Sequence, residues 1–302
     1  MAIGLTLLLA VGCVSNRPAS NTGLSKNPSS GKLSRQKSKR NNSNNFLAST
    51  KRHRQKFPSS SATQKMLLPT VTHKKDGALM VLVNSGVQRV SKPNLPQGVI
   101  RPVAQGTQAG SLFPPKAFPT FYMDRLETTV LQYKVFDNKY DEKPFTDGKE
   151  CPDCPAMGID WMSAYRYCHW AGKRLPTETE WVASAGGGQD NPWPWGTEFS
   201  PEKANLWGEK DGSLAVAPVG SYPQGASSYG MMDAVGNVWE WVSDSYFAPG
   251  KGSKKVRLRV VKGGGWTSAK RQARISFRNI VDPGIKNPTI GFRCARSISR
   301  KK

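Results

Sequence analysis

Residues 168–181 read CHWAGKRLPTETEW and predict the end of one helix and the start of the next. Upstream, Asp160 is placed to cap a helix that runs to Ala171 and ends at Gly172, since a carboxylate satisfies free first-turn amides and glycine adopts the left-handed conformation. Downstream, the capping box Thr177-Glu178-Thr179-Glu180 opens a second helix, which the glycines at 186–188 would stop. The stretch therefore predicts two helices joined by a short connection, with Gly172-Lys173-Arg174 as a helix exit of solvated charge.

On either side of these two helices, the apolar runs have the length of strands, and few segments show a regular pattern. The expected elements are strands at Ala78–Val83, Ala117–Arg125 and Val256–Lys262, a helix at Leu126–Phe136 capped by Thr128, and a long loop at 93–115. Beyond Gly186 the chain is rich in Gly, Pro, Trp and Asn, which indicates turns and short strands. Together these signals predict a loop-heavy α+β domain.

The N-terminal quarter has a different composition. Residues 14–75 hold 14 of the 44 Lys and Arg residues and no Asp or Glu, among Ser, Asn, Gln and Pro. Such a segment buries too little apolar surface to fold, so we predict a disordered basic linker over 14–77; a short basic tail follows at 298–302. Clustered cations favour an anionic partner through counterion release, whether nucleic acid, lipid headgroups or acidic envelope polymers.

The first thirteen residues, MAIGLTLLLAVGC, are apolar but too short to span a bilayer. Ala10-Val11-Gly12-Cys13 resembles a bacterial lipobox, which predicts a lipoprotein signal peptide over 1–13 with Cys13 lipidated; the alternative is a buried N-terminal segment. We expect an exported chain, anchored by lipid on the periplasmic face of the outer membrane. In that compartment nucleic acid is not an expected partner, and an anionic envelope polymer is the expected contact of the linker.

Four further cysteines, Cys151, Cys154, Cys168 and Cys294, make an even number, which favours two disulfides in an exported protein. Cys151-Pro-Asp-Cys154 also fits half a zinc site or a redox pair. A short structural disulfide is favoured because the sequence has no second CxxC and its three histidines are scattered. A bond from Cys168 to Cys294 would close a loop of about 125 residues, but spacing alone does not establish that pairing.

Residues 168–181 resemble the YCxWxGKRLPTExEWE core of the formylglycine-generating (sulfatase-modifying factor) family. Further blocks follow in the family's order: Pro194-Trp-Gly196, Ala204-Asn205, Ala217-Pro-Val-Gly220, Tyr229-Gly-Met-Met-Asp233, Gly236-Asn-Val-Trp-Glu-Trp241, Lys262-Gly-Gly-Gly-Trp266 and Gly291-Phe-Arg-Cys294. Upstream, 121–136 resembles the family's FYIDxxEVTxxxYxxF opening, so the resemblance spans about 78–297. It implies an irregular α+β fold related to C-type lectins, with low regular secondary structure and a disulfide between Cys168 and Cys294.

The resemblance also implies two calcium sites, since calcium prefers six to eight oxygen ligands. The expected ligands are the side chains of Asn205 and Asp211 with the carbonyls of Leu206 and Ser213, and, at the second site, Asn237, Glu240 and the Val238 carbonyl. The alternative is that Asn237 and Glu240 only form hydrogen bonds with buried backbone.

In formylglycine-generating enzymes two cysteines, five positions apart, bind copper(I) and oxidise a substrate cysteine. Here Ser268 and Ala273 occupy the corresponding positions. A hydroxyl and a methyl group do not replace the soft thiolates that copper(I) requires, so neither copper nor formylglycine generation is expected.

Around these positions the resemblance places the family's substrate groove, which here is basic. The groove residues expected to contact an anionic or peptide ligand are Trp266, Arg271, Arg274, Arg278 and Arg293. Lys262 and Lys270 belong to the same basic run. The alternative is a solvated basic face without a ligand.

The leading hypothesis is a non-catalytic, lipid-anchored binding or scaffold module, in a secretion or gliding-motility complex, whose partner is an envelope protein complex or a peptide. Two alternatives are an oxidative maturation enzyme of the same family that acts without the copper pair, and a lectin-like protein with a ligand surface at 266–292.

Overall fold

The computed structural model describes residues 70–90, 115–208, 215–249 and 255–298. The predicted signal peptide, almost all of the basic linker, most of the loop at 93–115, and the calcium candidates Asp211 and Ser213 lie outside these residues. The described residues all belong to one compact unit, Thr63–Lys302.

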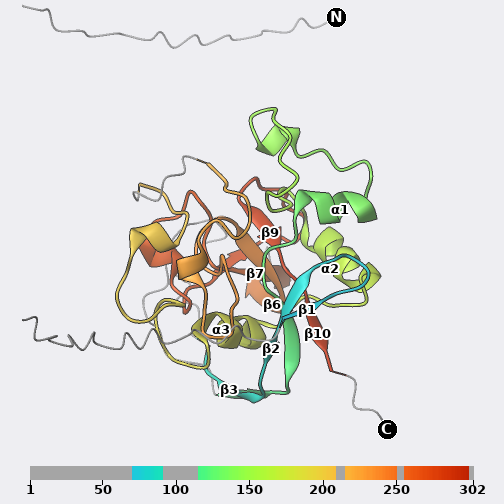
Figure 1. The fold of residues 1–302 in the computed structure, drawn as a ribbon. Helices are drawn as coiled ribbons and strands as arrows, with labels where there is room; N and C mark the ends of the chain where they lie inside the picture. Colours follow the sequence, from blue (N-terminus) through green and yellow to red (C-terminus); the bar gives the residue numbers. More distant parts are fainter. Residues whose placement is uncertain (1–69, 91–114, 209–214, 250–254, 299–302) are drawn as a thin grey trace, which may run out of the picture. The chain divides into compact units, whose positions relative to one another are not determined.

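The described residues of this unit form two four-stranded sheets, one strand pair, three α-helices and four short 3₁₀ helices (Figure 1). The first sheet is antiparallel, in the order β1 (Thr70–Thr72), β2 (Leu79–Val83), β5 (Phe121–Asp124) and β10 (Ala295–Ser297). The second has the order β8 (Asn279–Val281), β7 (Lys255–Lys262), β6 (Trp239–Pro249) and β9 (Ile290–Phe292), with β6 and β9 parallel. Strands β3 (Gly86–Gln88) and β4 (Lys116–Phe118) pair separately. The α-helices are α1 (Val130–Phe136), α2 (Trp161–Trp170) and α3 (Glu178–Gly186).

The two central helices form as residues 160–188 predict. The Asp160 carboxylate accepts a hydrogen bond from the Ser163 amide at 2.8 Å, which caps α2. At α3, Thr177 and Glu180 form the reciprocal capping box, and Gly187 ends the helix at φ 63°. Every residue of α3 is buried, so the helix is stabilised mainly by packing rather than by its short length of intrahelical hydrogen bonds.

Two boundaries differ from the sequence prediction. Helix α1 begins at Val130 and its cap is Thr129 rather than Thr128, because the Thr129 hydroxyl accepts from the Gln132 amide while the Gln132 side chain accepts from the Thr129 amide. The single strand expected at 117–125 is two strands, β4 and β5, in different sheets. Pro119 separates them, since proline has no amide hydrogen for a ladder.

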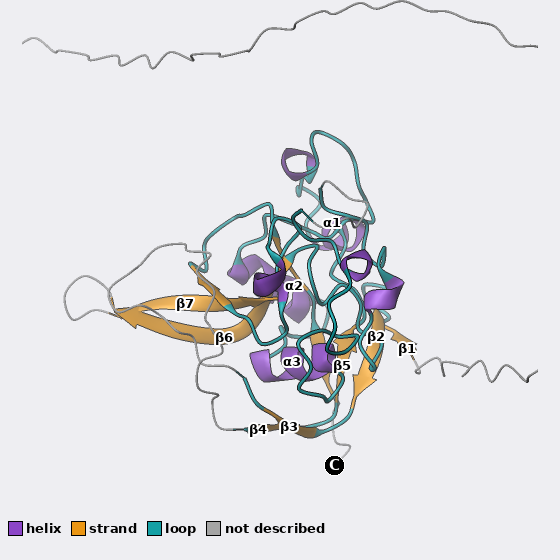
Figure 2. Ribbon diagram, turned by 90° about the vertical axis from the view of Figure 1, so that its left-hand side faces the viewer, coloured by secondary structure: helices purple, strands orange, loops and turns teal. Residues whose placement is uncertain are grey.

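The strand expected at Val256–Lys262 is β7, which has 8 residues, but its 11-residue partner β6 was not predicted; Figure 2 shows the two as a long paired ribbon. Their register shifts between Trp241 and Ser245. This irregularity breaks the alternation of buried and exposed residues on which a sequence prediction depends.

The predicted boundary between linker and domain at residue 77 is too late. Strand β1 lies within the predicted linker, and Asp76 is buried, with its carboxylate 2.6 Å from the Lys173 ammonium. Lys173 also binds Asp124 at 2.9 Å and is 5% exposed. The prediction of solvated charge at this helix exit is therefore wrong for Lys173, which links β5 and the segment after β1 to the end of α2.

Both disulfides are confirmed: Cys151 is bonded to Cys154, and Cys168 of α2 to Cys294. Cys294 lies between β9 of one sheet and β10 of the other. The second bond therefore joins α2 to the crossover between the sheets.

Removing the long-range disulfide should destabilise the protein far more than removing the short one. Cys168 and Cys294 are 126 positions apart, and closing a loop of that size in the unfolded chain contributes about 5 kcal/mol. The variant Cys168→Ala/Cys294→Ala is compared with Cys151→Ala/Cys154→Ala by urea unfolding, and the first should lose several kcal/mol more. Equal losses would contradict the assignment.

Candidate functional site

The two positions that replace the family's copper ligands lie together in the loop after β7. Gly264 has φ +80°, and a Cβ atom built on it would lie 3.0 Å from the Ala273 Cβ and 3.4 Å from the Ser268 Cβ. The short 3₁₀ turn Lys270–Ala273 brings the chain back to this point. The structure therefore brings together the pair that the sequence motif identified.

The side chains of Ser268 and Ala273 offer no soft ligand to a metal ion. The Ser268 hydroxyl accepts a hydrogen bond from the Gly265 amide at 2.9 Å and is buried, and Ala273 is fully buried. All four cysteines of the described residues form disulfides. Within that part of the chain, no thiolate is available to hold copper(I).

Two of the predicted groove arginines are not groove residues. Arg293 is fully buried, and Arg278 is 7% exposed and pairs with Glu178. Lys262 of the same basic run is also buried 3.3 Å from Glu178, and burial lowers its pKa to about 8. Arg271 and Arg274 are exposed and Trp266 is half-buried. The basic run therefore divides into three interior residues, Lys262, Arg278 and Arg293, and three exposed ones, Lys270, Arg271 and Arg274.

The interior part is organised by one ion pair. Both nitrogens Nε and Nη2 of Arg293 donate to the Glu240 carboxylate at 2.7 Å. The same guanidinium donates to the carbonyls of Arg125 and Met232 at 2.9 Å, and Trp181 Nε1 donates to Glu240 at 2.7 Å. Both side chains of the pair are fully buried, so these contacts satisfy charges that would otherwise be costly in the interior.

Two further buried carboxylates, missed by the sequence reasoning, lie around this pair. Glu127 accepts from Asn237 Nδ2 at 2.9 Å and from the Val238 amide at 3.3 Å, and Asp233 accepts from the Gly220 amide at 2.6 Å. Burial raises the pKa of Glu127 well above its usual range and that of Asp233 to about 6, with neighbouring carboxylates adding to both. For Asp233 the signal in the sequence was an acidic residue between apolar neighbours, Met232 and Ala234.

At the second predicted calcium site, Asn237 Oδ1 accepts from the Ala217 amide at 2.9 Å and its Nδ2 donates to Glu127 at 2.9 Å. Calcium at this site stays a prediction. Glu127, Asp233 and Glu240 suit a cation by charge, because they outnumber the one guanidinium. Among the described residues, however, no three His, Cys, Asp or Glu side chains are arranged around a common metal position.

The first calcium site is described only in part. Asn205 Nδ2 donates to the Ala215 carbonyl at 2.8 Å, and Leu206 is buried beside it, while Asp211 and Ser213 fall outside the described residues. Calcium at this loop stays a prediction.

Comparison with known families agrees with the fold and with this site. Residues 67–298 match the sulfatase-modifying factor enzyme 1-like domain, which is well over half of the chain. The chain belongs to the sulfatase-modifying factor family. The matched range also begins upstream of β1, in agreement with the corrected boundary.

Among curated relatives of this sulfatase-modifying factor protein, the mouse inactive C-alpha-formylglycine-generating enzyme 2 is 37% identical over 51% of the chain and 53% of the relative. The Bos taurus formylglycine-generating enzyme is 36% identical over 52% of this chain and 48% of that enzyme. The serine/threonine-protein kinase pkn1 of Chlamydia caviae is 40% identical over 48% of this chain and 24% of the kinase. The chain thus spans about half the length, or less, of these relatives.

Solved structures show the same fold. PvdO from Pseudomonas aeruginosa has a TM-score of 0.59 at 26% identity, covering 76% of this chain and 98% of PvdO. Treponema denticola variable protein 1 has a TM-score of 0.58 at 18% identity, covering 76% of this chain and 98% of that protein. The predicted irregular α+β, lectin-related architecture is confirmed.

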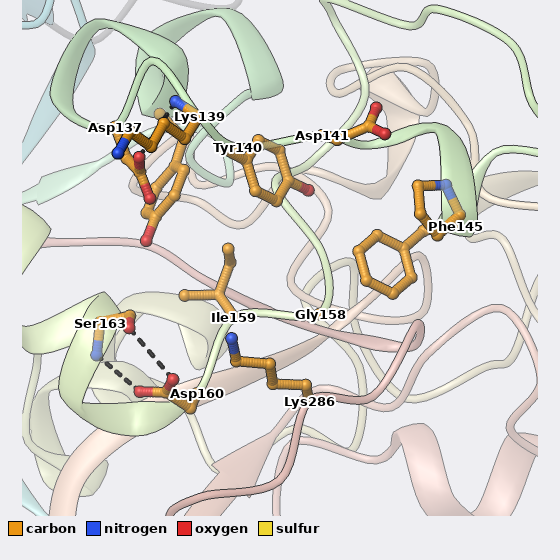
Figure 3. Close-up of a pocket in the computed structure, with 12 residues that line it drawn as sticks. Asp137, Lys139, Tyr140, Asp141, Phe145, Gly158, Ile159, Asp160, Ser163 and Lys286 are labelled. Atoms are coloured by element: carbon orange, nitrogen blue, oxygen red, sulfur yellow. Dashed lines mark hydrogen bonds between the residues drawn. The ribbon is translucent and has the colours of Figure 1, made fainter.

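A separate cavity of about 280 Å³ lies between α1, the start of α2 and the segment at 137–145 (Figure 3). Its wall includes Tyr140, Phe145 and Ile159, with Lys286 pointing towards it. None of its lining residues belongs to the predicted groove or to the degenerate pair. In the described residues, no helix is long and apolar enough to cross a membrane.

Removing one partner of the Arg293–Glu240 ion pair should strongly destabilise the fold. Arg293→Met leaves the Glu240 carboxylate buried without its partner, which should cost about 3–5 kcal/mol. The double variant Arg293→Met/Glu240→Leu should recover most of that loss, because both charges are then absent. Denaturant unfolding of wild type, both single variants and the double variant measures the coupling, and additive losses would contradict a direct pair.

Calcium binding is tested by chelation. We expect EGTA to lower the melting temperature and added calcium to restore it, because a divalent cation would offset unpaired carboxylate charge. Asp211→Asn tests the loop at 205–213, and Glu127→Gln tests the buried cluster; the variant that abolishes the calcium-dependent shift identifies the site. A melting temperature that calcium leaves unchanged would exclude both.

Proposed function

We propose that this sulfatase-modifying factor protein is a non-catalytic binding or scaffold module. The observation that carries the proposal is the pair Ser268 and Ala273, which lie together where the family's copper thiolates were expected. The loop geometry that assembles the pair is present, while the thiolates that would bind copper(I) are not. A buried hydroxyl that accepts from a backbone amide does not replace them.

The relatives support a role other than catalysis. The mouse relative is named inactive, and the similarity to the chlamydial kinase covers only 24% of that protein. A domain of this type therefore occurs both in a protein named as inactive and as one part of a larger chain with a different activity. Both cases are consistent with use of the fold for binding.

For location and partner, the support comes from sequence alone. We propose an exported protein anchored through lipid at Cys13, on the periplasmic face of the outer membrane, with its basic linker near an anionic envelope polymer. Its partner would be an envelope protein complex or a peptide, in a secretion or motility assembly. These are proposals about residues outside the described structure.

Copper affinity separates the scaffold from an oxidase. Wild type should not compete with a chromogenic copper(I) chelator, whereas Ser268→Cys/Ala273→Cys should gain copper(I) affinity, because the two Cβ atoms already converge beside Gly264. A single Ser268→Cys variant controls for non-specific thiol binding. Stoichiometric copper on wild type, or its oxidation of cysteine-containing peptides, would overturn the proposal and support the enzymatic alternative.

The scaffold role is tested in cells. Photocrosslinking from the domain surface, followed by membrane fractionation, should recover a defined envelope protein, and Cys13→Ala should move the protein to the soluble fraction. Recovery of an uncrosslinked protein only would count against a scaffold, and membrane retention of Cys13→Ala would count against the lipid anchor.

A further inference from the structure

Aromatic and cationic side chains gather on the surface beside the degenerate pair. Trp207 is 66% exposed, and its backbone amide donates to the Ser268 carbonyl at 3.2 Å, which places it next to the loop that holds Ser268. Lys270 and Arg274 flank the other end of the pair at Ala273, and both are exposed. An exposed indole does not contribute the free energy that its burial would give. A partner that covered Trp207 would therefore gain binding free energy from it.

The two cations of this surface, Lys270 and Arg274, lie over aromatic rings. The Lys270 ammonium lies 4.3 Å from the centre of the Phe199 ring, and the Arg274 guanidinium 5.9 Å from that of Trp193. These contacts orient the side chains and leave their charge available. In the part of the chain that the structure describes, neither cation forms an ion pair with a carboxylate.

Among the described residues, the charge around this surface is mainly positive. Two exposed acidic residues, Glu198 and Glu202, lie in the neighbouring segment, and Glu202 contacts the Ser200 hydroxyl. The described basic side chains there are Lys203, Lys270 and Arg274. Complementarity therefore favours an anionic partner.

We propose that Trp207, Lys270 and Arg274 form a docking surface for an acidic peptide segment that also carries an apolar side chain. Carboxylates of the segment would meet Lys270 and Arg274, and the apolar side chain would pack on Trp207. A featureless polyanion would need the cations but not the indole, whereas exposed tryptophan beside arginine is the composition of peptide-binding hot spots. This inference rests on the proposed binding role and specifies the chemistry of the partner.

The test uses the full chain and a fluorescent peptide of alternating Glu and Phe, with binding followed by anisotropy at two salt concentrations. Lys270→Glu/Arg274→Glu should weaken binding at least about tenfold, because two attractive contacts become repulsive. The matched control is Lys139→Glu/Lys286→Glu, which reverses two exposed lysines of the separate cavity. Each double variant lowers the net charge equally, so attraction by the basic linker is the same in both.

Trp207→Ala should weaken binding of the Glu-Phe peptide several-fold and leave a Glu-Ser peptide unaffected. Phe247→Ala, which removes another exposed aromatic side chain, should change neither. Equal effects of the two charge-reversal variants, or of the two aromatic variants, would overturn the docking surface, and so would equal affinity for the Glu-Phe and Glu-Ser peptides, which would indicate a simple polyanion surface.

The crosslinking experiment separates this inference from the broader proposal. If the envelope partner is still captured by Lys270→Glu/Arg274→Glu, the protein remains a scaffold but this surface is not its docking site. Loss of capture in that variant, with retention in Lys139→Glu/Lys286→Glu, supports both.

Discussion

The bidentate pair between Arg293 and Glu240 is the interaction on which the rest of this structure depends. Arg293 lies between β9 and β10, at the crossover from one four-stranded sheet to the other. Its guanidinium also binds carbonyls after β5 and before β6, while the next residue, Cys294, is bonded to α2. In a domain with few regular elements, backbone carbonyls in loops need donors, and one buried guanidinium with five N–H groups supplies several at once.

The loop that holds Ser268 and Ala273 keeps its shape without thiols at these two positions. The convergence of Ser268 and Ala273 depends on Gly264, on the turn at 270–273 and on backbone hydrogen bonds, none of which requires a thiol. The hydroxyl of Ser268 even contributes to the turn by accepting from Gly265. Loss of copper ligands therefore costs the fold little, and the surface above the pair remains available for binding.

Charge in this domain has two separate uses. Lys173, Lys262, Arg278 and Arg293 are buried, each opposite at least one carboxylate, and hold loops, strands and helices together. Lys270 and Arg274, only a few positions away in sequence, are exposed over aromatic rings. Counting basic residues along the chain cannot separate these uses, since desolvation and pairing, not residue type, decide what a cation does.

The sequence by itself determined the local structure and the family: the caps at Asp160 and Thr177, the ordered motif blocks, and the replacement of two thiolates by Ser268 and Ala273. These follow from short-range hydrogen bonding and from motifs read in order. Only the tertiary structure decided that Lys173, Arg278 and Arg293 are interior, that Asn237 donates to Glu127, and that the Trp207 amide bonds to the Ser268 carbonyl. Those outcomes depend on partners up to 169 positions away, and no local pattern encodes a contact between segments that meet only when the chain is folded.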